Sequence, residues 1–102
     1  MSVIVIVEFP GARVDAFTAA YQRNAETMTA ITADGRSKGA LHHMFVENEN
    51  GDVMAVDEWE TREQFDAFFA AQDDIRKVIA EVGLSGPPRT TSYRVIGTAD
   101  SF

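Results

Sequence analysis

Residues 53–69 read VMAVDEWETREQFDAFF, and this stretch decides the fold because it predicts a strand that runs directly into a helix. The first seven residues combine β-branched, apolar and acidic side chains and end at Trp59, the only tryptophan of the chain. Thr61 has the residue type of a helix N-cap, and Gln64 follows three residues later, which completes a capping box. The helix is therefore expected to begin almost immediately after the strand ends.

Three phenylalanines at helical spacing give this helix one apolar stripe: Phe65, Phe68 and Phe69. A tryptophan at the junction of strand and helix, placed above such a stripe, predicts the floor of a pocket. We expect the stripe to serve the hydrophobic core first and the pocket wall second. Phe65 and Phe68 are therefore candidate substrate-binding residues.

The preceding residues 40–47, ALHHMFVE, predict a second strand, and Asn50-Gly51 predicts a hairpin between the two strands. A two-residue turn pairs His42 with Trp59 and Met44 with Asp57, and it places His43 opposite Glu58. A four-residue loop shifts the register but keeps the same faces together. A three-residue loop exchanges the faces, because a slip of one residue turns every side chain to the other side of the sheet.

The rest of the chain predicts two more strands, over residues 2–9 and 90–97, and the first of these ends at Pro10-Gly11. It also predicts two more helices. A long helix over residues 12–33 ends at Asp34-Gly35, and a helix over residues 75–82 is capped by Gly83. The order is strand, helix, two hairpin strands, helices and strand. This is the split βαβ order of an α+β, ferredoxin-like fold, with an antiparallel sheet and the helices on one face. We expect a single domain over residues 1–102, since no repeat or long linker divides the chain.

The first strand is apolar on both faces, with Val3, Val5 and Val7 on one side and Ile4 and Ile6 on the other. A strand covered on both sides has this pattern. The helices can cover only one face, so another copy of the same sheet is the simplest cover for the other. The sequence therefore predicts a homodimer joined through the open sheet faces.

The composition excludes several classes of function. Nine basic residues against sixteen acidic ones give a net charge of −7, which disfavours nucleic acids and anionic membrane surfaces as partners. The chain has no cysteine, so disulfides, thiolate nucleophiles and Cys-ligated zinc are excluded, and a reducing, cytoplasmic location fits. Glu8 ends the first apolar run early, and we expect a strand there rather than a signal peptide or a membrane span.

The hairpin GALHHMF…GDVMAVDEWETREQFDAFF resembles that of the antibiotic biosynthesis monooxygenase family, and the resemblance extends over the whole element order. Its most specific part is an acidic residue, one spacer and Trp-Glu, here Asp57 to Glu60, running into a Phe-rich helix. The resemblance implies a dimeric α+β barrel. It also implies oxidation without metal or flavin, in which the electron-rich, deprotonated form of a phenolic or quinol-like substrate reacts with O₂ directly.

The resemblance further implies a pocket role for Trp59. The family's other pocket residues are an Asn, a Tyr and an Arg, and Asn24, Tyr93 and Arg94 supply these residue types here without a spacing that assigns them. A related branch degrades haem with an Asn on the first strand and a haem-ligating His on the helix after the Trp. This chain has no Asn on its first strand and has Phe68 and Phe69 in that helix, so haem degradation is disfavoured.

We predict a site on one face of the hairpin, with His42, Asp57 and Trp59 as catalytic residues. His42 would take the proton of a bound phenol, and Asp57 would orient its imidazole. Substrate-binding residues are expected on the same side: Met44, Phe65, Phe68, and Tyr21 and Asn24 from the stripe of the long helix. The alternative is that His42 packs in the core or faces solvent and that Trp59 only closes the core.

No metal site is expected, because adjacent His42 and His43 point to opposite faces of a strand and no third ligand can be named. No dinucleotide fingerprint or phosphate loop is present either, so no cofactor is expected. Two functions remain: a cofactor-independent monooxygenase for a small aromatic or quinol-type compound, or a non-catalytic dimeric module that binds or senses one. An open pocket with an oriented polar group favours the enzyme. A cavity filled by Phe and Met side chains favours the module.

Overall fold

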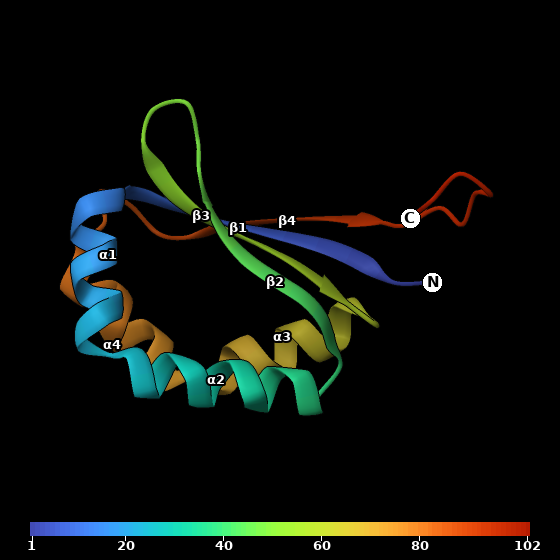
Figure 1. Cartoon of the computed structure of the whole chain (residues 1–102), viewed down its shortest axis with the longest axis horizontal. Helices are drawn as coiled ribbons and strands as arrows, with labels where there is room; N and C mark the ends of the chain where they lie inside the picture. Colours follow the sequence, from blue (N-terminus) through green and yellow to red (C-terminus); the bar gives the residue numbers. More distant parts are fainter.

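The computed structural model describes all 102 residues. A sheet of four antiparallel strands lies over four helices (Figure 1). The elements are β1 (Val3–Arg13), α1 (Val14–Arg23), α2 (Ala25–Ser37), β2 (Ala40–Glu47), β3 (Asp52–Trp59), α3 (Arg62–Ala71), α4 (Asp73–Val82) and β4 (Arg89–Arg94). The strand order β2-β3-β1-β4 confirms the predicted α+β, ferredoxin-like arrangement.

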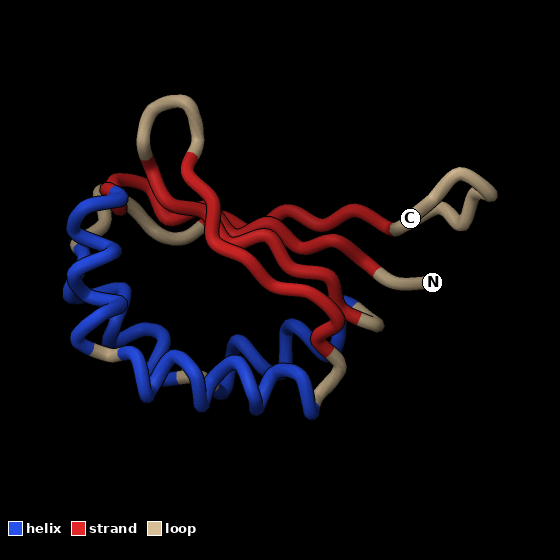
Figure 2. The backbone as a smooth tube through the Cα atoms, in the orientation of Figure 1, coloured by secondary structure: helices blue, strands red, loops and turns tan.

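All four helices lie on one face of the sheet and leave the other face bare (Figure 2). On β1, Val5 and Val7 point toward the helices and are buried, whereas Ile4 and Ile6 lie on the bare face and are half-exposed. Both faces of this strand are therefore apolar, as the sequence predicts, but helices cover only one. None of the helices is long and apolar enough to cross a membrane.

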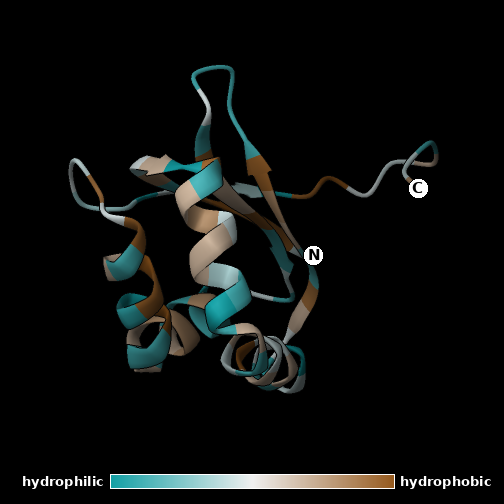
Figure 3. Ribbon diagram, turned by 60° about the vertical axis from the view of Figure 1, so that its left-hand side comes forward, coloured by the Kyte–Doolittle hydropathy of each residue, from teal (hydrophilic) through white to brown (hydrophobic).

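Hydrophobic residues colour parts of the strands and appear again in the segment after the polar strand β4, which extends away from the body of the molecule (Figure 3). The backbone N–H of Val95 donates to the carbonyl of Ser2, which holds the start of this segment beside β1. Beyond that point Ile96 and Phe102 are exposed. The C-terminal segment thus adds exposed apolar side chains beyond the end of the sheet.

The junction of β3 and α3 has the predicted geometry. The Thr61 hydroxyl accepts from the backbone N–H of Gln64 at 3.2 Å, and the Gln64 side-chain oxygen accepts from the backbone N–H of Thr61 at 3.0 Å. Both halves of the capping box are therefore present. The cap fixes the helix start directly after Trp59 and so sets the position of the phenylalanine stripe below it.

The predicted long helix is two helices, because Asn24 interrupts it with φ −119° and ψ 25°. The Asn24 amide donates to the carbonyl of Ala20 at 2.8 Å, a side-chain bond that competes with continuation of the helix. The second helix also runs past the predicted stop and includes Gly35, which is buried against Phe68 and Trp59. A Cβ at Gly35 would lie 3.3 Å from the Phe68 ring, so glycine here permits close packing rather than ending the helix.

The first strand also continues beyond its predicted end. Pro10 and Gly11 lie inside β1, where the pairing with β3 becomes irregular between Glu8 and Arg13. Gly11 has a φ of +81°, which a glycine adopts without strain, and the Pro10 carbonyl accepts from the backbone N–H of Ser85. The break predicted at Pro10-Gly11 is thus a local irregularity in a longer strand.

The loop between β2 and β3 consists of three residues, 49–51, because Asn48 and Asp52 still pair with each other. The prediction of a two-residue turn is therefore wrong. Asn48 and Asp52 close the loop through an N–H···O bond of 2.9 Å, and Gly51 has a φ of +83°. The Asn48 side-chain oxygen accepts from the backbone N–H groups of Asn50 at 2.9 Å and Asp52 at 3.0 Å. This side chain builds the turn from inside, which selects the longer loop.

The loop exchanges the faces of β2. His43 pairs with Asp57, and His42 pairs with Glu58. A further irregularity lies between His42 and Ala40. Ala40 pairs with Trp59, directly after the pair of His42 and Glu58, so Leu41 is an extra residue in β2. The predicted pairs of His42 with Trp59 and of Met44 with Asp57 are therefore wrong.

Candidate active site

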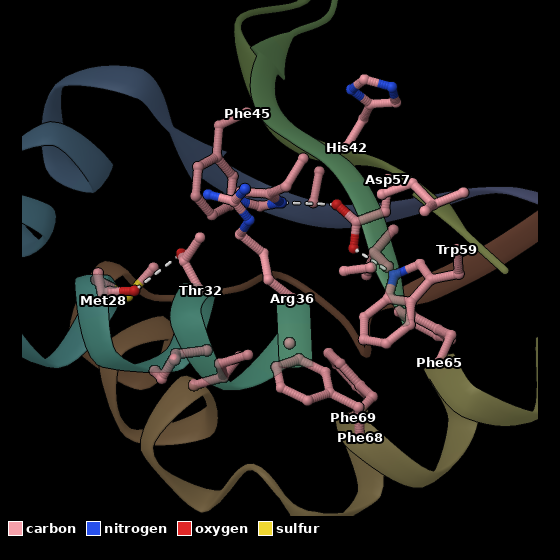
Figure 4. A pocket seen from close by; sticks show the side chains of 18 of the residues that line it. Met28, Thr32, Arg36, His42, Phe45, Asp57, Trp59, Phe65, Phe68 and Phe69 are labelled. Atoms are coloured by element: carbon pink, nitrogen blue, oxygen red, sulfur yellow. Dashed lines mark hydrogen bonds and ion pairs between the residues drawn. The ribbon is translucent and has the colours of Figure 1, made fainter. Parts of the chain in front are cut away.

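A cavity of about 330 Å³ lies between the inner face of the β2–β3 hairpin and helices α2, α3 and α4 (Figure 4). This volume is within the usual range for small-molecule sites. Most of its lining residues are hydrophobic, 15 of 21. The chain's own side chains therefore leave a sizeable apolar space open next to Trp59.

Aromatic rings form the wall of this cavity at the α3 end. Trp59 is 1% exposed, with its ring centroid 5.1 Å from that of Phe68 and 5.8 Å from that of Phe65. Phe69 stacks on Phe65 at 5.5 Å with an interplanar angle of 19°. The predicted arrangement of Trp59 above the phenylalanine stripe is therefore present, as a wall of the cavity. Its rings offer flat surfaces for an aromatic ligand.

A chain of three polar side chains crosses the cavity wall. Asp57 Oδ1 lies 2.6 Å from His43 Nδ1, and Asp57 Oδ2 accepts from Trp59 Nε1 at 3.2 Å (dashed lines in Figure 4). The side chains of His43 and Asp57 are 32% and 13% exposed. All three residues line the cavity, so this hydrogen-bonded chain lies in the wall of a mostly apolar space.

The contact with Asp57 sets what His43 can do. A carboxylate only accepts hydrogen bonds, so Nδ1 of His43 carries the proton that it donates to Asp57. In the neutral imidazole this tautomer leaves the lone pair on Nε2, which can then act as a hydrogen-bond acceptor and a base. A carboxylate that orients an imidazole in this way also stabilises the imidazolium after proton uptake. The arrangement can take a proton from a hydroxyl placed in the cavity.

His42 and Met44 do not belong to this site, which corrects their prediction. The imidazole of His42 points away from the cavity in Figure 4 and is 73% exposed, although the residue borders the rim. Its Nε2 lies 3.7 Å from Glu58 on the bare sheet face. Met44 is exposed and pairs with Val56 on that same face. The three-residue loop is the physical cause, since it turns His43 inward in place of His42.

Tyr21 and Asn24 also lie outside the cavity. Tyr21 packs with its ring centroid 6.3 Å from that of Phe45 and borders a shallow surface groove beside His43. The Asn24 amide is used at the junction of α1 and α2, where it donates to Ala20 and to Glu81. Of the predicted site residues, the structure brings together Asp57, Trp59, Phe65 and Phe68 around one cavity.

Several cavity residues were not predicted as site residues, and three of them matter for the chemistry: His43, Phe45 and Arg36. His43 and Phe45 share the inner face of β2, with ring centroids 4.7 Å apart. Asn48, at the start of the turn, is the signal that could have identified them, because an Asn there favours a loop built on its side chain. Arg36 was missed because the helix was expected to end before it.

No three or more His, Asp or Glu side chains are grouped so that they could hold a metal ion. The two carboxylate oxygens of Asp57 are already engaged by His43 and Trp59. That the activity needs neither metal nor flavin remains a prediction.

The fold defines the class of protein first: a ferredoxin-like domain with one bare sheet face and a cavity beneath the other. No family model and no curated protein sequence matches the chain. Solved structures do match in fold. A monooxygenase of Streptomyces coelicolor from the gene ActVA-Orf6, in complex with nanaomycin D, is 18% identical with a TM-score of 0.71, over 99% of this chain and 93% of that one.

Two other solved structures share this fold. A variant of SnoaB, a cofactor-independent oxygenase from Streptomyces nogalater, is 18% identical with a TM-score of 0.63 and covers 98% of both chains. A structure described as an antibiotic biosynthesis monooxygenase is 12% identical with a TM-score of 0.61, over 95% of this chain and all of that one. The resemblance to this family is therefore confirmed at the level of the fold. Function must be argued from the site.

Proposed function

We propose that this protein is a cofactor-independent monooxygenase for a small aromatic, phenolic or quinol-type substrate. The observation that carries this proposal is the open, aromatic-walled cavity with an oriented His43–Asp57–Trp59 chain inside it. A packed core would have filled this space, and a purely apolar binding pocket would need no carboxylate to orient a histidine. The fold shared with oxygenases supports the proposal.

The reaction begins with the substrate ring between the aromatic walls and its hydroxyl at Nε2 of His43. His43 takes the hydroxyl proton, and Asp57 stabilises the resulting imidazolium. The deprotonated ring is electron-rich and reacts with O₂. One oxygen atom becomes a ring carbonyl, the other leaves as water, and the substrate supplies all the electrons, so that a phenol with a CH₂ or CH at the reacting carbon becomes a quinone.

Trp59 has two tasks in this reaction. Its indole N–H holds one oxygen of Asp57, which leaves the other oxygen directed at His43. Its ring, with those of Phe65 and Phe68, excludes water from the anionic substrate. We therefore assign base catalysis to His43, its orientation to Asp57, and substrate packing to the three aromatic residues.

We also propose that the protein is a homodimer joined through the bare sheet face, forming a barrel from two sheets. Half-exposed apolar side chains occupy the two central strands of that face: Ile4, Ile6, Met54 and Val56. Such a face needs a cover, and a second copy provides a self-complementary one. The lack of cysteine supports a cytoplasmic location.

Anthrone is a suitable test compound, because it is a flat polycycle that ionises to a phenolate-like anion and gives anthraquinone and water with one O₂. The purified protein should consume oxygen with anthrone, with and without EDTA, and one atom of labelled O₂ should appear in the anthraquinone. Binding of anthrone without any acceleration of oxygen uptake would refute the monooxygenase and support a non-catalytic binding module. Loss of activity with EDTA would refute independence from metal.

A further inference from the structure

Arg36 lies in the last turn of α2 and lines the cavity. In Figure 4 its side chain extends from α2 toward β2, across the side of the cavity where Phe45 lies. The residue is exposed, so its guanidinium lies where the cavity meets solvent. The cavity therefore has a permanent positive charge at its mouth and the His43–Asp57 pair on its wall.

This charge has no partner in the chain. Seven of the nine Lys and Arg side chains lie within 4.0 Å of a carboxylate oxygen. The two without such a partner are Arg36 and Arg94, and only Arg36 lines the cavity. A cation near a helix C-terminus is favourable in itself, but that effect does not require the side chain to extend over a pocket.

Two carboxylates that are close to Arg36 in sequence or share its cavity are already engaged. Asp34, two residues before Arg36, binds Lys38 at 2.9 Å and Gln72 at 3.0 Å. Asp57 uses one oxygen for His43 and the other for Trp59. Because no carboxylate oxygen of the chain lies within 4.0 Å of Arg36, its guanidinium is free to pair with an anion from outside the chain. The guanidinium fits a carboxylate particularly well, because it can donate two parallel hydrogen bonds.

We infer that the substrate of this cavity is an aromatic acid, whose carboxylate pairs with Arg36 at the mouth while its ring hydroxyl faces His43. This inference rests on the proposed function in taking the same cavity as the substrate site. The net charge of −7 repels anions from the surface in general, so Arg36 supplies a local attraction that the rest of the surface does not. Arg36 is thus a specificity-determining residue.

Calorimetric titration with two matched probes tests the inference without requiring turnover. The probes are a naphthol and the hydroxynaphthoate that adds a carboxylate to the same ring system. The wild-type protein should bind the hydroxynaphthoate about tenfold more tightly, as expected for one charge-assisted contact at a partly solvated site. Arg36→Gln should abolish the preference, and Arg36→Lys should restore part of it. Arg94→Gln is the matched control, because it removes the other unpaired arginine away from the cavity and should keep the full preference.

Equal affinity of the wild-type protein for both probes would overturn the inference, and so would a preference that survives in Arg36→Gln. Failure of both probes to bind would overturn it as well. The proposed function fails separately: an Arg36-dependent preference without anthrone-driven oxygen uptake supports the aromatic-acid site and refutes the oxygenase. Oxygen uptake with no preference for the acid refutes Arg36 alone.

Discussion

Replacing Trp59 by Phe should destabilise the protein by an amount that can be derived from its contacts. The change removes the indole N–H that donates to Asp57 at 3.2 Å, and a hydrogen bond to a charged group is worth about 1.5 kcal/mol at its weaker end. The smaller ring also loses part of the packing against Phe65 and Phe68, which costs about 1 kcal/mol. Together these give a loss of roughly 2.5 kcal/mol in the free energy of unfolding.

Urea denaturation of the wild-type and Trp59→Phe proteins measures this loss directly, with the transition followed by circular dichroism. A domain of this size typically has a free energy of unfolding of about 5–15 kcal/mol, so the variant should still fold. A double-mutant cycle with Asp57→Ala isolates the bond, and we expect a coupling energy of about 1.5 kcal/mol, the value assigned to the bond above. Phe65→Leu is a control, because it alters the aromatic wall but leaves the indole bond intact. A coupling energy near zero would show that Trp59 does not hold Asp57.

Three further predictions concern the bare face, the cavity floor and the hairpin turn. Ile6→Asp places a charge on the bare sheet face and should shift the protein from dimer to monomer in analytical ultracentrifugation, whereas an unchanged mass would rule out this face as the interface. Gly35→Ala should narrow the cavity, since its Cβ would lie 3.3 Å from Phe68 and 3.7 Å from Trp59 and push these rings toward the ligand space. Calorimetry should detect weaker anthrone binding while circular dichroism shows an intact fold, and undiminished binding would place the ligand elsewhere. Asn48→Ala removes the acceptor for two backbone N–H groups and should lower the free energy of unfolding by about 1–2 kcal/mol in urea, and an unaffected stability would mean that the side chain does not build the turn.

The strand-to-helix stretch could be predicted from sequence because its determinants are local. Thr61 and Gln64 satisfy each other's backbone groups within one turn, and the phenylalanine spacing follows directly from that helix start. The element order then restricts the topology to one familiar arrangement. The pocket floor below Trp59 is therefore contained in residues 53–69 alone.

The choice of histidine could not be predicted with the same rules. Asn50-Gly51 is compatible with loops of different length, and the choice depends on how the Asn48 side chain bonds inside the turn. Because adjacent strand residues face opposite sides, one residue of difference exchanges His42 and His43. A small local effect thus decided which imidazole meets Asp57.

The ends of helices α1 and α2 could not be predicted from local sequence either. Apolar periodicity continues across Asn24, so it cannot reveal that a side-chain bond to Ala20 divides the helix in two. Gly35 was expected to end the helix, but tertiary packing against Phe68 explains the glycine instead. Only when the helix is extended to Ser37 does Arg36 come to line the cavity, so this residue depended on a helix end that local sequence did not define.

The most direct test of His43 as the catalytic base compares two substitutions at adjacent residues, His43→Ala and His42→Ala. The measurement is the initial rate of anthrone-dependent oxygen uptake. Loss of a general base typically lowers the rate by a factor of about 10²–10⁴, so His43→Ala should reduce uptake at least a hundredfold. His42→Ala changes a side chain on the bare face and should leave the rate per folded protein within about twofold of wild type. A large loss in His42→Ala with full activity in His43→Ala would contradict the assignment of the site to the inner face of the hairpin.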